Sequence, residues 1–118
     1  MCGNLLQLEW WKLNTDAAFN NRSGVATLGM ALRDEHEAVL LSATGCIHSI
    51  KSSLYAEVLA VLFGLKLTVE HNFLRVIVES DAQVAIDLIS KGEVGLWEGG
   101  NLLQDIHDLA ATCEFCSL

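Results

Sequence analysis

The sequence has 118 residues, 52% of them hydrophobic, and its 7 basic and 15 acidic residues give a formal net charge of −8. This length and hydrophobicity predict one domain with a substantial core and exclude a disordered chain. The acidic balance speaks against a broad phosphate-binding surface, but not against a site where metal ions supply positive charge. No run reaches the ~18 apolar residues of a membrane span, and the first residues lack a signal-peptide pattern. We therefore expect an intracellular protein without membrane contact.

Residues 1–9 are predicted to be a poorly specified lead-in, and residues 10–118 to form the domain. The domain begins with three predicted strands separated by short polar turns, which together predict an antiparallel meander. These strands cover residues 10–19, 25–33 and 38–44. In the first strand, Lys12, Asn14 and Asp16 are expected to share one face of the sheet, because side chains alternate along a strand.

The longest apolar stretch, Ser53–Asn72, predicts a helix, because it is rich in Ala and Leu and lacks Pro. It is apolar nearly all round, so it is expected to be buried on more than one side. A short strand at 74–80 follows, and a right-handed crossover should place it parallel to a neighbour. Two more helices, the second capped by Asn101, and a last strand are predicted at 82–91, 101–112 and 113–118. This order of elements predicts an α/β fold with three layers.

The sequence contains four cysteines, Cys2, Cys46, Cys113 and Cys116. The spacing of the last two invites a zinc or redox interpretation, but there is no second pair of this kind and no His pair at ligand spacing. Both fall in the predicted last strand, where residues three apart point to opposite faces. Buried free thiols are therefore the preferred interpretation, and disulfides are not expected without a secretory signal.

Three carboxylates lie at the edges of these elements: Asp16 in the first strand, Glu57 in the first turn of the long helix, and Asp81 at the end of the fourth strand. If the fourth strand pairs beside the first, the two aspartates lie on adjacent strands and the helix can bring Glu57 over them. Three carboxylates at one place repel each other unless cations neutralise them. Hard oxygen ligands suit Mg²⁺ or Mn²⁺, and two such ions about 4 Å apart clamp the attacking and leaving oxygens of a phosphodiester.

Each carboxylate also has a structural interpretation. Asp16 could be an edge residue before a turn. Asp81 could belong to a helix cap, because residues 80–83 fit a capping box with Ser80 as the N-cap. Glu57 could complement the positive end of the helix dipole. Together, in this strand order, the three residues favour a site.

Four segments carry a resemblance to a known family: residues 12–19 (KLNTDAAF), 31–34 (ALRD), 52–57 (SSLYAE) and 76–81 (VIVESD). With these motifs in this order, residues 10–118 resemble the plant-type ribonuclease H-like domains. This reverse-transcriptase-like RNase H family is often found beside, or derived from, the reverse transcriptases of retroelements. The resemblance implies an RNase H fold with a mixed five-stranded sheet. It also implies endonucleolytic hydrolysis of RNA in RNA–DNA hybrids with two Mg²⁺ (or Mn²⁺) ions.

By position, the resemblance assigns Asp16 to both metal ions, and Glu57 and Asp81 to one ion each. A metal-activated water would attack the phosphorus in line and leave a 3′-hydroxyl and a 5′-phosphate. The expected contacts with nucleic acid, which include the two serines that face the minor groove in the family, are Ser52, Ser53, Asn14 and Arg22.

The family carries a fourth Asp in a helix after the fifth strand, and this sequence ends at Leu118, before that position. The domain is therefore expected to be C-terminally truncated relative to the family, with an uncovered apolar sheet face through which copies could self-associate. Two alternatives to a ribonuclease stay open. One is a catalytically inactive nucleic-acid-binding module of the same fold. The other is a protein-interaction module, which the net charge of −8 favours.

Overall fold

The computed structural model describes residues 10–91, 99–113 and 115–117, so the lead-in predicted for residues 1–9 lies outside the described residues. The elements in chain order are β1 (Trp11–Asn20), β2 (Val25–Arg33), β3 (Val39–Ile47), α2 (Ser53–Glu70), β4 (Arg75–Ser80), α3 (Gln83–Lys91), α4 (Gly100–Thr112) and β5 (Phe115–Ser117). Most of these bounds agree with the predicted ones to within two residues. β3 is the exception, because it continues three residues beyond its predicted end.

The extra length of β3 includes Gly45, although glycine usually weakens a strand. In the structure Gly45 lies opposite Leu28 of β2, and the ladder continues to Ile47. A Cβ at Gly45 would come within 3.3 Å of the Phe63 ring on α2. The glycine therefore leaves room for this ring over the strand, which is a contact between distant parts of the chain.

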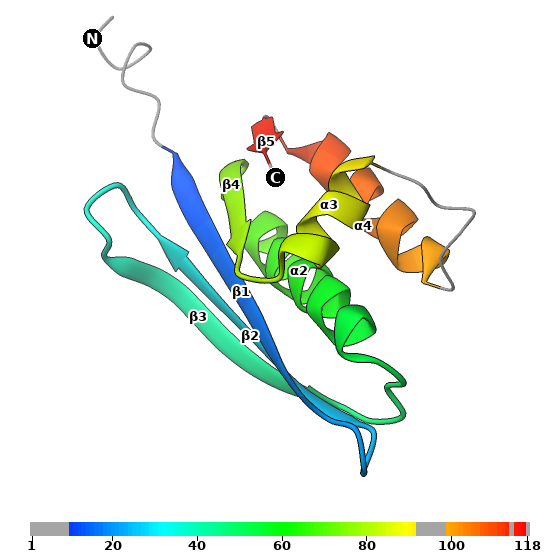
Figure 1. Cartoon of the computed structure of the whole chain (residues 1–118). Coiled ribbons are helices and arrows are strands. Elements are labelled where there is room, and N and C mark those ends of the chain that lie inside the picture. The colour runs from blue at the N-terminus through cyan, green and yellow to red at the C-terminus, as the bar shows by residue number, and fades with distance from the viewer. Residues whose placement is uncertain (1–9, 92–98, 114, 118) are drawn as a thin grey trace, which may run out of the picture.

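The strands form a five-stranded mixed sheet in the order β3-β2-β1-β4-β5 (Figure 1). The first three strands are antiparallel neighbours, which confirms the predicted meander. β4 lies parallel to β1, from Trp11 opposite Val76 to Thr15 opposite Ser80, and β5 lies parallel to β4. The predicted crossover is thus confirmed, and it places the end of β4 beside the middle of β1.

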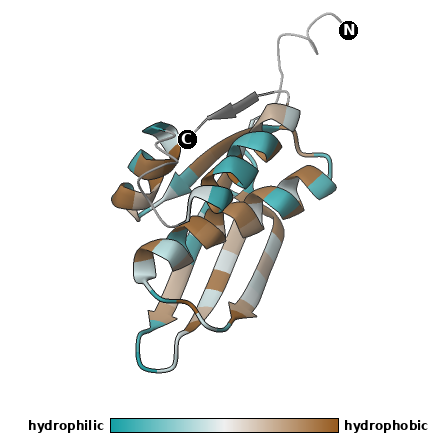
Figure 2. Ribbon diagram, turned by 90° about the vertical axis from the view of Figure 1, so that its right-hand side faces the viewer, coloured by the Kyte–Doolittle hydropathy of each residue, from teal (hydrophilic) through white to brown (hydrophobic). Residues whose placement is uncertain are grey.

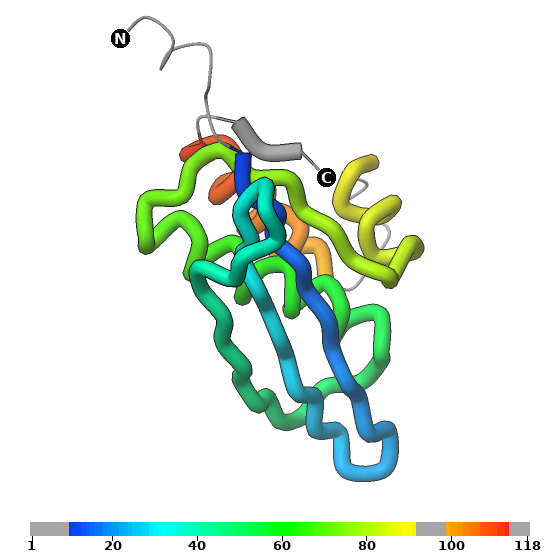
Figure 3. The backbone as a smooth tube through the Cα atoms, turned by 90° about the vertical axis from the view of Figure 1, so that its left-hand side faces the viewer, coloured from blue at the N-terminus to red at the C-terminus, as the bar shows by residue number. Residues whose placement is uncertain are grey.

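All described helices lie on one side of this sheet. α2 crosses β1 and β2, and α3 and α4 pack beside α2 (Figures 1 and 2). The opposite face of the sheet is open in Figure 3. This arrangement confirms the predicted α/β fold with helices packed on a mixed sheet. Among the described residues the helices form one layer, because α3 and α4 pack against α2.

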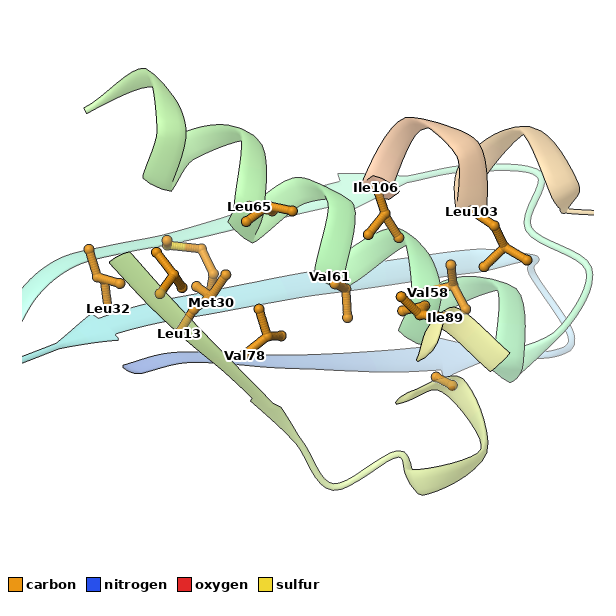
Figure 4. Packing of buried hydrophobic residues seen from close by; sticks show 12 residues of the cluster. Leu13, Met30, Leu32, Val58, Val61, Leu65, Val78, Ile89, Leu103 and Ile106 are labelled. Atoms are coloured by element: carbon orange, nitrogen blue, oxygen red, sulfur yellow. The ribbon is translucent and has the colours of Figure 1, made fainter. Parts of the chain in front are cut away.

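The core lies between the sheet and the helices. Figure 2 shows alternating brown and pale bands along the strands behind the helices, as expected for strands with one buried face. The buried side chains come from β1, β2, β4 and all three helices (Figure 4): Leu13, Met30, Leu32, Val58, Val61, Leu65, Val76, Val78, Ala85, Ile89, Leu103 and Ile106. As its sequence predicted, α2 is buried on more than one side.

The ends of α2 show why the helix begins and stops where it does. The Ser52 Oγ accepts the backbone N–H of Tyr55 at 3.1 Å and caps the first turn. At the other end, the N–H of His71 donates to the Leu67 carbonyl, and Asn72 takes a positive φ of 64°, which Asn tolerates.

α4 begins differently from the prediction. Its N-cap is Gly99, which provides no side-chain hydrogen bond, and Asn101 lies inside the first turn. The prediction that Asn101 caps this helix is therefore wrong.

The open face of the sheet is mostly small and polar. Its side chains include Lys12, Asn14, Asp16, Thr27, Ser42, Thr44 and Glu79. Among the described residues this face does not form the apolar surface expected from a missing helix, so self-association through it has no apolar basis. The part of the chain that the structure describes contains no helix long and apolar enough to cross a membrane.

The prediction of buried thiols in one strand for Cys113 and Cys116 holds only in part, and Cys46 is exposed on β3. Cys113 is half-buried at the end of α4, where its Sγ donates to the Leu109 carbonyl at 3.7 Å. Because β5 begins at Phe115, Cys113 and Cys116 do not share a strand.

Candidate active site

The candidate site lies where β4 ends beside β1. The parallel ladder runs as far as Thr15 opposite Ser80, so Asp16 and Asp81, the next residues along, lie where the two strands separate. On the other side of β1, Gly29 of β2 lies opposite Asp16. A Cβ at Gly29 would meet only the Asp16 carbonyl oxygen, at 3.9 Å, so there is open space beside the aspartate.

A cleft of about 730 Å³ opens at this point, bounded by β1, β2, β4 and the start of α3. Its lining includes Asn14, Asp16, Glu79, Asp81 and Gln83. The structure therefore brings together two of the three predicted carboxylates and one of the predicted nucleic-acid contacts.

Glu57 approaches this place from α2. Because the helix begins at Ser53, Glu57 lies one turn inside it, and the first turn contains no acidic residue. The helix-dipole interpretation is therefore wrong, since that effect falls off within the first turn. Burial raises the pKa of Glu57, and the negative charge of Asp16 raises it further. A hydrogen bond from the Ala17 backbone lowers this pKa, and the charge of Asp81 raises it.

The three carboxylates converge without forming a ready-made cage. Among the described residues, no three Asp, Glu, His or Cys side chains are placed so that they could hold a metal ion as they stand. The Glu57 Oε1 is buried and has no hydrogen-bond partner within the described parts of the chain. The residues nevertheless fit a hard divalent cation, because carboxylate oxygens are its preferred ligands. A bound cation would reduce the repulsion among the three carboxylates and would give the Glu57 Oε1 a partner.

Asp81 does not serve as part of a capping box. The Ser80 Oγ accepts the N–H of Ala82 at 3.1 Å, one residue earlier than a capping box requires. The Gln83 side chain does not reach back toward Ser80, because its Nε2 donates forward to Asp87 at 2.8 Å. The Asp81 carboxylate takes no part in this cap and lines the cleft.

Three of the predicted nucleic-acid contacts lie outside the cleft. Ser52 caps α2, Ser53 is its exposed first residue, and Arg22 is exposed in the turn between β1 and β2. The Ile50 N–H donates to the Gly24 carbonyl at 2.8 Å and joins this turn to the loop before α2. The two serines and Arg22 therefore lie at the same end of the domain.

Glu79 is a residue of the cleft that the sequence analysis missed. Asn14 and Glu79 lie opposite each other on β1 and β4, and the Asn14 Nδ2 donates to the Glu79 Oε1 at 3.2 Å. The sequence contained a signal for Glu79, because it lies two residues before Asp81 and residues two positions apart on a strand point to the same face. It was missed because the segment is dense in β-branched residues, which is typical of a buried strand.

The raised pKa of Glu57 predicts a pH-dependent effect on stability. Between its unfolded and folded pKa, the folded protein binds more protons than the unfolded chain, so stability falls as the pH rises through this window. Glu57→Gln cannot ionise, so without metal we expect it to melt a few degrees higher than the native protein at about pH 8. The gain should shrink toward about pH 4, where Glu57 itself is neutral.

Thermal melts of both proteins across this pH range measure the effect. Glu35→Gln, at an exposed position of the hairpin between β2 and β3, is the matched control. An equal gain in the control would show that the stabilisation comes only from lowering the net negative charge.

Comparison with known proteins defines the class to which the fold and the cleft belong. The structure is similar to the N-terminal RNase H domain of Rv2228c from Mycobacterium tuberculosis, with 17% identity, a TM-score of 0.79, and coverage of 93% of this chain and 80% of that one. It is also similar to RNase H1 from the halophilic archaeon Halobacterium salinarum, with 16% identity and a TM-score of 0.79. This match covers 92% of this chain and 82% of that one. A third similar structure is LC11-RNase H1 in complex with an RNA/DNA hybrid, with 18% identity and a TM-score of 0.74. This match covers 91% of this chain and 81% of that one. The chain therefore has the RNase H fold.

The family follows from the sequence. The family described as "Reverse transcriptase-like" matches residues 14–118, and the chain belongs to it. This match confirms the reverse-transcriptase-like family that the four motifs suggested. No curated protein matches the sequence significantly.

Proposed function

We propose that this domain is a metal-dependent ribonuclease that hydrolyses the RNA strand of RNA–DNA hybrids. The strongest support is the Glu57 carboxylate, whose buried oxygen without a partner lies within reach of the charges of Asp16 and Asp81 beside an open cleft. The RNase H fold supports the same reaction, and one of the similar structures holds an RNA/DNA hybrid.

Asp16, Glu57 and Asp81 would hold the Mg²⁺ or Mn²⁺ ions, of which two are expected. When bound, such ions neutralise charge on the scissile phosphate and lower the pKa of a bound water. The protein provides the position of the three carboxylates. β1 and β4 fix the two aspartates where the strands separate, and α2 fixes Glu57 one turn from its capped end.

We assign recognition of the hybrid to the cleft and to the end of the domain that carries the loop before α2. Ser53 and Arg22 are exposed there, and Asn14 lies in the cleft. Hydroxyl, amide and guanidinium groups suit contact with 2′-hydroxyls, base edges and phosphates across a minor groove. Because the chain carries a net charge of −8, binding should depend strongly on the divalent cation.

The test is an incubation of the purified chain with an end-labelled RNA–DNA hybrid in Mg²⁺, in Mn²⁺ and in EDTA. We expect cuts in the RNA strand with either metal and none in EDTA, with no cuts in RNA–RNA or DNA–DNA duplexes. Absence of RNA cleavage from a folded chain in both metals would contradict the proposal.

A second candidate is a hybrid-binding module without turnover, because the three carboxylates do not form a ready-made metal cage in the described structure. It predicts metal-dependent binding of the hybrid without product, measured by fluorescence anisotropy at low salt. Absence of hybrid binding under these conditions would leave the protein-interaction alternative.

A further inference from the structure

β3 is the outer strand of the sheet. It pairs with β2 on one side, and no described segment pairs with its other side (Figures 1 and 3). Proteins usually protect such an edge with Lys, Pro or inward-pointing charges, because unpaired N–H and C=O groups are a template for another strand. The nine residues of β3, VLLSATGCI, contain neither a charge nor a proline. A one-residue shift in the ladder near Leu32 and Arg33 affects only the start of this edge.

Exposed apolar side chains are concentrated on the same strand. Among the described residues, four large hydrophobic side chains are exposed, and three of them are Val39, Leu40 and Ile47, with exposed fractions of 51%, 45% and 38%. The fourth, Val84, is on α3. An uncharged apolar edge on a chain with a net charge of −8 is therefore a local feature of β3.

Charges flank the two ends of β3 with opposite sign. Glu35 and Glu37 are exposed in the hairpin before the strand, where Glu37 also pairs with Lys12 at 3.4 Å, whereas Lys51 is exposed in the loop after the strand. If a second β3 pairs antiparallel with the first, the acidic end of each copy meets the basic end of the other. Parallel pairing would set like charges against each other, which is unfavourable.

We propose that two copies of this chain associate through β3, in antiparallel pairing about a twofold axis at Thr44, so that their sheets become one continuous sheet. The ladder between β2 and β3 is regular from Leu41 to Ile47, and Thr44 is the midpoint of this stretch. In this register Leu41 lies opposite Ile47 of the second copy, and Glu37 lies near its Lys51. The edge is thus self-complementary, as a twofold interface must be.

The pairing of one short strand buries less area than a permanent dimer needs, so the association should be weak, with a dissociation constant of about 10 µM to 1 mM. The contact involves β3, whereas the cleft is lined by β1, β2, β4 and α3. Dimer formation therefore does not rest on the proposed nuclease function, and either idea can fail alone.

Sedimentation velocity of the whole chain over about 10 µM to 1 mM tests the proposal. We expect a dimer that grows with concentration in the native chain. Thr44→Lys and Thr44→Glu should each be monomeric, because two like charges would lie directly opposite each other at the axis. An equimolar mixture of the two variants should associate again, since the two charges then attract.

Thr27→Lys is the matched control, because Thr27 is an exposed threonine on the same sheet face but on the inner strand β2. It should dimerise like the native chain. A native chain that stays monomeric throughout the range overturns the proposal. So does a Thr44→Lys variant that dimerises as well as the native chain, or a mixture that stays monomeric.

A cross-link tests the register. Ser42→Cys places a second exposed thiol on β3, opposite Cys46 of the second copy in the proposed pairing and within disulfide distance for an antiparallel pair. Mild oxidation should give a covalent dimer with this variant and not with the native chain. An Ala18→Cys variant, whose exposed thiol lies on the inner strand β1 and away from Cys46, should give none, and equal cross-linking in all three proteins would contradict the register.

Discussion

Asp16→Asn is expected to lower the rate of hybrid cleavage by about 1,000-fold or more. Asp16 lies where β1 and β4 separate, and its charge acts directly on Glu57. Asn keeps the size of the side chain but removes the negative charge that would attract a divalent cation. A loss of several kcal/mol in transition-state stabilisation corresponds to this factor, because each 1.36 kcal/mol is tenfold in rate.

The variant should remain folded, because it removes one of three carboxylates that repel each other without metal. Circular dichroism and a thermal melt check this before kcat/KM is measured on the end-labelled hybrid. Asp105→Asn is the matched control, since Asp105 is exposed on α4, outside the cleft lining. If the Asp16 variant cleaves at the native rate, the nuclease site is elsewhere or the activity belongs to a contaminant.

The meeting of Asp16 and Asp81 could be predicted from the sequence because it follows from connectivity. A strand, a crossover helix and a second strand in one sheet have a fixed hand, so β4 had to run parallel to a neighbour. The polar-apolar alternation of β1 then places Asp16 on the open face. The structure confirms the pairing of β4 with β1, on which the convergence of these two residues depends.

Features that depend on packing between distant segments were not predicted. The apolar composition of β4 does not show that its second face is open, and Glu79 was therefore missed. The continuation of β3 through Gly45 depends on the position of the Phe63 ring, which no local pattern encodes. The docking of α3 and α4 beside α2 likewise depends on long-range packing, because each helix could bury its apolar side against either face of the sheet.

Gly64→Val is expected to cost about 3 kcal/mol or more in the free energy of unfolding, with a fall in melting temperature of about 10 °C or more. Gly64 is buried on α2, where the helix lies close to β1 and β2. A Cβ at this position would lie 3.0 Å from the Thr15 Cγ2, and 3.1 Å from both the Leu13 Cδ1 and the Met30 Cβ. The two further methyl groups of Val have no free volume there, so the helix would have to move away from the core.

Gly64→Ala separates crowding from helix propensity. Alanine gains about 1 kcal/mol of propensity over glycine, which offsets part of the cost of its single Cβ, so its loss should be much smaller than that of valine. Gly29→Val is the matched control on the sheet, because a Cβ there meets only the Asp16 carbonyl oxygen at 3.9 Å and valine favours a strand. Urea unfolding of the three variants measures these differences. A Gly64→Val protein as stable as the Gly29→Val protein would show that α2 does not need a glycine to pack on the sheet that holds the cleft.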